Sequence, residues 1–328
     1  MKILVTGATG FLGRAIVGEL LQNNFEVFTT GKSAQADLPN YFPADLTDSE
    51  SLSALEKIGR IDAIIHSAGL AHQFGKTSRE IFRKVNVEGT RNILDLAAKL
   101  NAGKFILISS VSVYGRARQA KPETVFEENL PCQPQGFYAE SKLEAEKIAA
   151  RICADNAIDL TILRPSTIVG ENDRGNVARL IEAVDRRRFV WVGDGKNAKS
   201  LIYKTDVARA CLLFLENSVA AAPNNKTNIY NVTAEPVSMR EIVGEMEKAL
   251  DRRVLPIRIP VSPLRKSLHF IGKASGSIKL RKYAETLDKW LSDDVFSGEK
   301  IRREIGFLPL VSPLEGIRRE ALHYRNRK

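Results

Sequence analysis

The chain has few of the residues that build metal centres and disulfides. Its 328 residues include 3 cysteines and 4 histidines. Cys132, Cys153 and Cys211 are odd in number and widely spaced, so they are interpreted as reduced structural thiols rather than a metal-binding or redox pair. The histidines also lack the spacing of metal ligands; they are His66, His72, His269 and His323. We therefore expect no bound metal.

Long apolar runs are missing as well. No run approaches the ~18 apolar residues that a membrane-spanning helix needs. The first apolar run, Ile3–Val5, is too short for a signal peptide and leads directly into a glycine-rich turn. The composition, 44% hydrophobic and 27% charged, is typical of a soluble globular protein. We expect a cytoplasmic enzyme with no membrane span.

Positive charge is in excess, with a net charge of +10. Basic clusters lie at 186–188, 252–253, 318–319 and 325–328. They are interpreted first as solvated surface and second as attraction for anionic ligands. Because no aromatic-interleaved stripe or nucleic-acid motif accompanies them, nucleic acid is not an expected partner.

The first half of the chain alternates between apolar strand patterns and helix patterns. Predicted strands lie at 3–5, 25–30, 61–66, 104–109 and 160–163, and predicted helices at 14–21, 49–58, 80–100 and 139–155. Asp48 or Ser49 would cap the second helix. This alternation predicts an α/β fold: a doubly wound parallel Rossmann sheet covered on both faces.

The pattern changes after Arg164-Pro165, where loops lengthen and Pro256, Pro260 and Pro263 mark an irregular stretch. Helices are predicted at 239–250 and 313–324. We expect a cofactor-binding domain over 1–165 and a smaller α/β C-terminal substrate domain over 166–328. A helix at 206–215 is predicted to return to the main sheet, so that about 202–235 would belong to the first domain.

A glycine-rich turn joins the first strand to the first helix. Gly7 permits a tight turn, Gly10 lets the backbone approach a pyrophosphate, and Gly13 lets the helix pack closely on the strand. The free N–H groups at the helix start would hold the phosphates. The predicted cofactor contacts here are Gly7, Thr9, Gly10, Phe11, Leu12, Gly13 and Arg14. An ordinary turn is the alternative.

The end of the second strand bears on the choice of cofactor. No carboxylate for a ribose 2′-hydroxyl stands in Thr30–Ser33. Lys32, with Arg14, could instead neutralise a 2′-phosphate, which favours NADP(H) over NAD(H); otherwise both are surface cations. Asp45-Leu46 could flank the adenine, or Asp45 could cap a helix.

Tyr138 and Lys142 lie four residues apart on a predicted helix and therefore share a face. An ammonium near a phenol favours the phenolate, and lowering the phenol pKa from ~10 by about three units corresponds to ~4 kcal/mol. Tyr138 could then exchange a proton with a substrate oxygen during hydride transfer. Such spacing also arises by chance.

Hydroxyl groups follow the strand at 104–109. Ser110, at the carboxyl end of a parallel strand, could hydrogen-bond the oxygen that changes between alcohol and ketone, or act as a strand-end cap. Asn86, a polar residue in an amphipathic helix pattern, could bridge active-site waters or be exposed.

Taken together, these motifs resemble the extended short-chain dehydrogenase/reductase family, in particular its nucleotide-sugar epimerases and ketoreductases of bacterial polysaccharide pathways. The matching segments span nearly the whole chain and include 6–13, 45–46, 66–69, 85–90, 109–115, 138–142, 163–165, 176–177, 192–206, 308–309 and 314–316. The resemblance implies a catalytic triad of Ser110, Tyr138 and Lys142. It also implies cofactor contacts at Lys32, Asp45, Leu46, Ala68, Asn86, Tyr138, Lys142 and Pro165.

The same resemblance implies a UDP-sugar substrate. Its contacts would be Ser110, Ser112, Tyr138, Thr167, Asn176, Val177 and Lys199. Lys199 stands where many members carry a phosphate-binding arginine, and lysine lacks the bidentate fork. Thr167 replaces an asparagine of many 4-epimerases. A homodimer is implied through the helices beginning near Glu80 and Ala139.

Two departures bear on the reaction. Val111 and Ser112 stand where dehydratases of the family carry an Asp-Glu pair, which argues against dehydration. The missing carboxylate after the second strand suits an exchangeable NADPH, so reduction of a UDP-4-keto-sugar is placed ahead of UDP-sugar 4-epimerisation, with UDP-glucose or UDP-N-acetylglucosamine as substrate. A non-sugar ketone reductase and a non-catalytic cofactor-sensing protein are the remaining alternatives; the intact Tyr/Lys pair disfavours the second.

Overall fold

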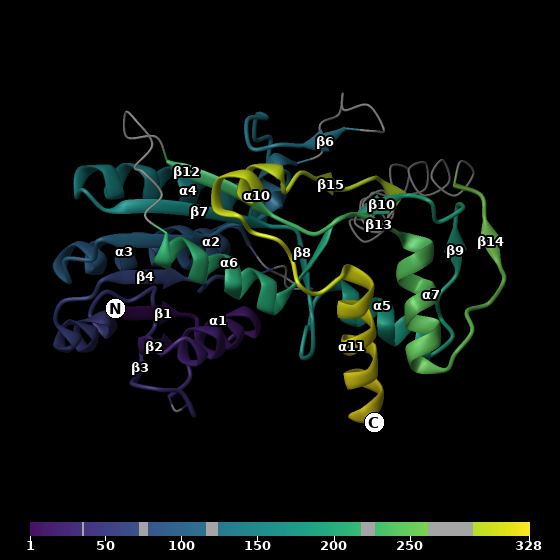
Figure 1. The fold of residues 1–328 in the computed structure, drawn as a ribbon, viewed down its shortest axis with the longest axis horizontal. Helices are drawn as coiled ribbons and strands as arrows, with labels where there is room; N and C mark the ends of the chain where they lie inside the picture. Colours follow the sequence, from purple (N-terminus) through teal and green to yellow (C-terminus); the bar gives the residue numbers. More distant parts are fainter. Residues whose placement is uncertain (35, 72–77, 116–123, 218–226, 262–290) are drawn as a thin grey trace.

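A seven-stranded parallel sheet forms the centre of the computed structural model, which describes residues 1–34, 36–71, 78–115, 124–217, 227–261 and 291–328 (Figure 1). The strand order is β12-β7-β5-β4-β1-β2-β3. The strands are β1 (Lys2–Thr6), β2 (Glu26–Gly31), β3 (Tyr41–Pro43), β4 (Ala63–His66), β5 (Lys104–Ile108), β7 (Asp159–Pro165) and β12 (Asn228–Val232). The predicted Rossmann sheet is confirmed. His72, Pro263 and His269 lie outside the described residues.

Apolar side chains cover both faces of this sheet. In β1, Ile3 and Val5 point into one core and Leu4 into the other, because successive strand side chains alternate. Helices α1 (Phe11–Gln22) and α6 (Lys204–Glu216) pack on the first face. The 3₁₀ helix η1 (Ser51–Ile58), with α3 (Gly89–Lys99) and α4 (Phe137–Asp155), packs on the second. Residues 206–215, expected to return to the sheet, lie in α6 on its first face.

Two predicted helices differ in type. The segment expected as one helix over 80–100 is α2 (Arg79–Phe82), a π-helical turn η2 (Arg83–Glu88) and then α3. The helix expected over 49–58 is the 3₁₀ helix η1, and its start is preceded by Asp48, whose Oδ1 accepts the Glu50 N–H at 3.0 Å. A π turn holds one residue more than an α turn, which sequence periodicity does not reveal, and such turns concentrate at functional sites.

A further apolar core, called the second core below to distinguish it from the core on the two faces of the sheet, lies beside the sheet. Its helices are α5 (Asn176–Asp185), α7 (Met239–Leu250) and α11 (Pro313–Asn326), which gather at the right of Figure 1. Short strands accompany them: β8 (Thr167–Val169), β9 (Trp191–Val192), β10 (Ala198–Lys199), β11 (Leu201–Tyr203), β13 (Val237–Ser238) and β14 (Arg258–Ile259). The remaining elements are η3 (Val111–Tyr114), β6 (Val125–Phe126), β15 (Val295–Phe296) and α10 (Glu299–Ile305).

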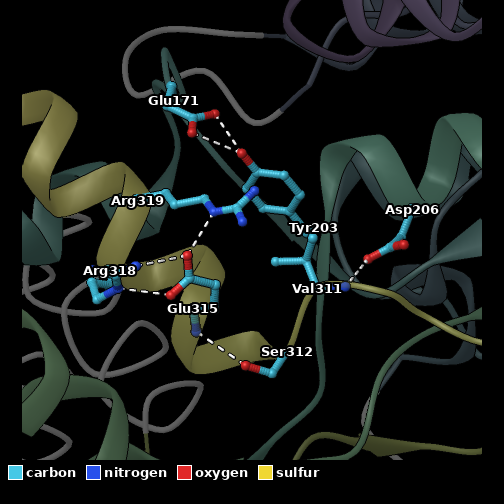
Figure 2. A network of polar contacts seen from close by, with 8 residues as sticks. All are labelled: Glu171, Tyr203, Asp206, Val311, Ser312, Glu315, Arg318 and Arg319. Atoms are coloured by element: carbon cyan, nitrogen blue, oxygen red, sulfur yellow. Dashed lines mark hydrogen bonds and ion pairs between the residues drawn. The ribbon is translucent and has the colours of Figure 1, made fainter.

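Buried Asp206 fastens the second core to α6. Its carboxylate accepts the backbone N–H group of Leu310 at 2.8 Å and that of Val311 at 3.1 Å, just before α11. Figure 2 shows the bond to Val311. Ser312 then caps α11 by accepting the Glu315 N–H at 3.2 Å. Because α6 itself packs on the sheet, this carboxylate connects α11 to the sheet through α6.

Arg319 of α11 is the next contact along this network. Its guanidinium lies 5.4 Å from the centre of the Tyr203 ring and bonds Glu315 at 2.7 Å (Figure 2). The Tyr203 hydroxyl in turn donates to Glu171 at 2.7 Å. The loop after β8 is thus held against α11. Within the described residues, no helix is both long and apolar enough to cross a bilayer.

Candidate active site

The carboxyl ends of the parallel strands bring most of the predicted residues to one edge of the sheet. The chain runs outward from β1 through β2 and β3, then returns on the other side of β1 with β4. Ligands of open α/β sheets bind where the strand order reverses in this way. Each strand leads to a predicted residue at this edge. β1 leads into the glycine turn, β2 to Lys32, β3 to Asp45, β4 to Ala68 and β5 to Ser110, and β7 ends at Pro165.

The glycine turn is closely packed and its helix start is open. A Cβ on Gly7, whose φ is +67°, would lie 2.6 Å from the Ala68 Cα, and one on Gly13 would overlap the Gly7 carbonyl. Gly10 precedes α1, and no side chain caps the helix. The first N–H groups of α1 therefore keep the capacity to bind a pyrophosphate, so these residues fit a dinucleotide.

Lys32 is paired with a carboxylate. Its Nζ lies 2.8 Å from Asp45 Oδ2, and hydrogen bonds from Lys32 and from the Thr47 backbone hold the pKa of Asp45 at about 2. No carboxylate stands at the end of β2, but the fold brings one there from beyond β3. Arg14 is exposed and has no ion pair within the described ranges. The proposed 2′-phosphate site thus has one cation already neutralised.

Ser110, Tyr138 and Lys142 meet above the end of β5. The Ser110 side chain hydrogen-bonds Tyr138 and accepts the Ser112 N–H at 3.1 Å. Phe82 lies edge-on to the Tyr138 ring, with centroids 6.1 Å apart. Lys142 Nζ donates to the Ile108 carbonyl at 2.8 Å. The Ser110 and Tyr138 hydroxyls are therefore held together, and the Lys142 ammonium is bonded to the last residue of β5.

The pKa of Tyr138 moves opposite to the sequence-based expectation. Burial raises the pKa of its phenol, although the Ser110 hydrogen bond opposes that rise. Burial also lowers the pKa of Lys142 to about 8, opposed by the charge of Glu146. The Tyr138 pKa is raised rather than lowered because desolvation disfavours the phenolate, while the Lys142 ammonium bonds the Ile108 carbonyl.

A buried ion pair lies directly behind these residues. Arg164 of β7 forms two hydrogen bonds with Glu146 of α4, at 3.0 and 2.6 Å, and both side chains are 4% exposed. The Ser109 hydroxyl donates to the same carboxylate at 2.5 Å. Arg164 also lies 4.9 Å from the centre of the Tyr114 ring. With Ser109, the pair joins β7 and α4 to the carboxyl end of β5.

Asn86 is buried, contrary to the expectation that it could be exposed. Its Nδ2 donates to the Leu70 carbonyl at 3.1 Å and to Ser141 Oγ at 2.9 Å, and its Oδ1 accepts the Leu70 N–H at 2.7 Å. It therefore joins the loop after β4 to α4. A Cβ on Gly69 would lie 3.2 Å from both Asn86 Oδ1 and Lys142 Nζ, which places this loop beside the lysine.

His66 is a neutral core residue. Burial lowers its pKa to about 3. Its Nδ1 lies 2.7 Å from Thr6 Oγ1 and its Nε2 3.0 Å from Thr90 Oγ1. Because the Thr90 hydroxyl donates to the Asn86 carbonyl at 2.6 Å, His66 must carry its proton on Nε2. Among the described residues, no cluster of His, Cys, Asp or Glu could hold a metal ion.

The predicted substrate residues lie in different surroundings. Thr167 is exposed, whereas Val177 is buried in the second core and Asn176 begins α5. Lys199 is buried, with 8% of the residue exposed. Its Nζ donates to Asp294 Oδ2 at 2.6 Å and to the Ser292 carbonyl at 2.7 Å. The buried Ser112 hydroxyl has no hydrogen-bond partner among the described residues.

Sequence reasoning missed several residues of this site. Glu146 lies four residues after Lys142, hence on the same helix face, and Arg164 lies in a motif already quoted for the family resemblance. Those two signals could have suggested the buried pair. Nothing in the sequence connects Lys199 with Asp294, which lies 95 residues away along the chain.

Curated relatives cover nearly the whole chain. The N-acetyl-α-D-glucosaminyl-diphospho-ditrans,octacis-undecaprenol 4-epimerase of Escherichia coli O157:H7 is 27% identical, over 97% of this chain and 93% of that relative. The 2-alkyl-3-oxoalkanoate reductase of Stenotrophomonas maltophilia (strain K279a) is 29% identical, over 97% of this chain and 98% of the reductase. An epimerase and a reductase are thus both similar to this chain.

Solved structures agree on the fold. The UDP-glucuronic acid 4-epimerase of Bacillus cereus, solved in complex with NAD, has a TM-score of 0.76 at 22% identity and covers 100% of both chains. A family model matches residues 3–232, which include the glycine turn, the Tyr138/Lys142 helix and the strands of the central sheet. By that match the chain belongs to the NAD dependent epimerase/dehydratase family.

Proposed function

We propose that the protein is an NAD(P)-dependent oxidoreductase acting at C4 of a nucleoside diphosphate sugar, with Ser110, Tyr138 and Lys142 as its proton-transfer residues. The observation that carries this proposal is the hydrogen bond between Ser110 and Tyr138, with Lys142 one helical turn further along α4. These groups lie at the edge of the sheet where the glycine turn can hold a dinucleotide. The bound dinucleotide supplies or accepts the hydride.

The protein's own groups handle the proton. In the direction of reduction, the neutral Tyr138 phenol donates a proton to the oxygen formed at C4, and Ser110 hydrogen-bonds that oxygen. In the direction of oxidation, Tyr138 must act as phenolate, so the Lys142 ammonium has to stabilise it. The unpartnered Ser112 hydroxyl provides a further donor for the sugar.

The leading reaction is 4-epimerisation of a UDP-sugar. Its support is the similarity over nearly the whole chain to relatives named as 4-epimerases. Reduction of a UDP-4-keto-sugar, which the sequence placed first, is the second candidate. It is favoured by the lack of a carboxylate at the end of β2, but Asp45 now pairs with Lys32 and removes part of that argument. Both reactions use the same hydride and proton transfer.

We further propose that the enzyme uses NADP(H) rather than NAD(H), as Lys32 and Arg14 indicate in the sequence. With Lys32 held by Asp45, it depends mainly on the exposed Arg14. Titrating both cofactors into the protein and its Arg14→Ala variant tests it. A preference for NADP(H) that disappears in the variant supports the proposal, whereas tighter binding of NAD(H) overturns it.

One assay separates the two reactions. The enzyme is incubated with UDP-glucose, UDP-N-acetylglucosamine and their 4-keto derivatives, each with NAD(H) or NADP(H). Interconversion of C4 epimers without net cofactor consumption indicates the epimerase; reduced cofactor consumed in proportion to product indicates the reductase. A further arm of the assay uses polyprenyl-diphospho-N-acetylglucosamine, because one relative is named for a sugar linked to undecaprenol through a diphosphate. Turnover of this compound would show that the diphosphate need not carry a nucleoside.

The catalytic assignment has its own test. Tyr138→Phe keeps the ring but removes the proton donor, so turnover should fall by about 10²–10⁴-fold, the usual contribution of general acid–base catalysis. Tyr324→Phe, which alters a phenol on α11, is the matched control and should keep full turnover. Undiminished turnover in Tyr138→Phe would overturn the assignment.

We also propose a homodimer formed through the helices that begin near residues 79 and 137. Ile81 and Phe137, each 46% exposed, lie on α2 and α4. Exposed apolar side chains on these two helices suit an isologous helix interface. Sedimentation that shows only monomer at high concentration would overturn this proposal.

A further inference from the structure

The C-terminal ends of α5, α7 and α11 meet at one place. Asp185 ends α5, and its carboxylate lies 3.8 Å from Arg252 Nε beyond α7 and forms an ion pair with Lys328 beyond α11. Arg325 of α11 donates to the Ala249 carbonyl of α7 at 2.7 Å. The ends of α7 and α11 lie together at the lower free end of the molecule in Figure 1. We call this region the basic tip.

Exposed cations dominate the basic tip. They lie at 186–188, at 252–253, and at 325, 327 and 328. Fewer carboxylates accompany them: Asp185 is shared between two cations, Glu182 pairs with Arg186 at 3.0 Å, Glu247 accepts the Val254 N–H at 2.7 Å, and Asp251 follows α7. Arg187, Arg188 and Arg253 have no ion pair in the part of the chain that the structure describes. The tip therefore carries a concentrated positive charge from three helix ends.

Exposed apolar side chains follow Arg252 and Arg253 along the chain. Leu255 is 39% exposed and Ile257 51% exposed. Both stand between Arg253 and Arg258, in the stretch that leads from α7 into β14. Exposed aliphatic side chains flanked by arginines are typical of segments that lie at the bilayer interface, where the charged groups meet lipid phosphates and the aliphatic groups enter the acyl boundary.

We propose that the basic tip docks on the surface of an anionic lipid bilayer. Clusters of this size and sign attract anionic lipid headgroups. A second copy of the same surface would be repelled by like charge, and a nucleic acid would leave Leu255 and Ile257 exposed to water. The docking would be peripheral and reversible, and it is independent of which reaction the active site performs.

Vesicle co-sedimentation tests the proposal on the full chain. The protein is mixed with phosphatidylcholine vesicles with or without an equal share of phosphatidylglycerol, at about 0.05 M and about 0.5 M salt, where screening lengths differ several-fold. We expect binding to the anionic vesicles at low salt, release at high salt and no binding to the neutral vesicles. Absence of binding to anionic vesicles at low salt overturns the proposal.

Charge-reversal variants locate the surface. Arg187→Glu/Arg188→Glu/Arg253→Glu should lower vesicle affinity by at least tenfold. The control Arg302→Glu/Arg303→Glu changes two exposed arginines on α10 and should lower affinity much less. Equal loss in both variants would show a non-specific charge effect and overturn the assignment to the tip.

The apolar residues have a matched control too. Leu255→Ser/Ile257→Ser should weaken binding, whereas Leu308→Ser/Leu310→Ser, at the opposite end of α11, should not. Binding of duplex DNA is measured in parallel for the wild type and the arginine variant. If the wild type binds DNA but not vesicles, and the arginine variant binds neither, nucleic acid is the partner and the proposal fails. Turnover on soluble UDP-sugars should be unchanged in all tip variants, so failure of docking leaves the proposed reaction standing.

Discussion

Replacing Glu146 with leucine should destabilise the protein strongly. The Arg164 side chain is only 4% exposed, and the change leaves its guanidinium without a carboxylate partner. It also removes the acceptor of the Ser109 hydroxyl hydrogen bond. Breaking a buried ion pair by removing one partner costs about 3–5 kcal/mol. For a chain of this size, that corresponds to a fall in melting temperature of about 5–10 °C.

The double variant Glu146→Leu/Arg164→Met separates the ion pair from the space it fills. Removing both charges eliminates the uncompensated guanidinium, so most of the lost stability should return. Thermal unfolding followed by circular dichroism, at one pH and salt concentration, compares wild type, both single variants and the double variant. The expected order places each single variant clearly below the double variant.

Catalysis gives a second measurement on the same variants. The Glu146 charge raises the pKa of Lys142 toward its ordinary value. Without that charge the pKa of Lys142 falls below about 8, and the basic limb of the turnover–pH profile should move to lower pH.

A Glu146→Leu variant that melts within about 2 °C of wild type would refute the reasoning about stability, because a guanidinium left unpaired in the interior must destabilise the fold.

Further predictions concern other groups. Burial and neighbouring acids raise the pKa of Glu320 to about 8, so its contribution to stability is complete below pH ~4.5 and is lost as pH rises through about 8. Glu320→Gln should therefore melt higher than wild type at pH 9 and equally at pH 4.5; a parallel pH dependence in both proteins would contradict this. Gly13→Ala, whose Cβ would overlap the Gly7 carbonyl, should abolish dinucleotide binding measured by calorimetry. Gly18→Ala, with no heavy atom within 4 Å of its Cβ, is the control and should stabilise α1 by about 0.5–1 kcal/mol; cofactor affinity retained in Gly13→Ala would refute the close-packing argument.

Much of the sheet could be predicted because its strands are short apolar runs between helix patterns. β1, β2, β4, β5 and β7 fall close to their expected positions. The two-residue strands beside the second core have no such signal, because their pairing depends on distant segments: Lys199 of β10 pairs with Val237 of β13. Local pattern cannot report a contact whose partner lies far along the chain.

The candidate site was predictable in its residue types but not in its electrostatics. The Ser110 side chain hydrogen-bonds Tyr138, and Lys142 lies one turn further along the same helix, but their catalytic role stays a prediction. The sequence does not show that Asp45 reaches Lys32, since β3 lies between them along the chain. Nor does it show that burial raises the pKa of the Tyr138 phenol in spite of the Ser110 hydrogen bond. Both effects depend on solvent exposure and tertiary proximity, which residue order does not report.

The π turn between α2 and α3 sets the direction in which the side chains of α3 point relative to those of α2. One added residue rotates every later side chain by about 100°. Phe82, before the turn, faces Tyr138, while Ile93 and Leu94, after it, face the apolar core. Deleting one residue from the turn would therefore rotate Ile93 and Leu94 away from the core while leaving Phe82 in place.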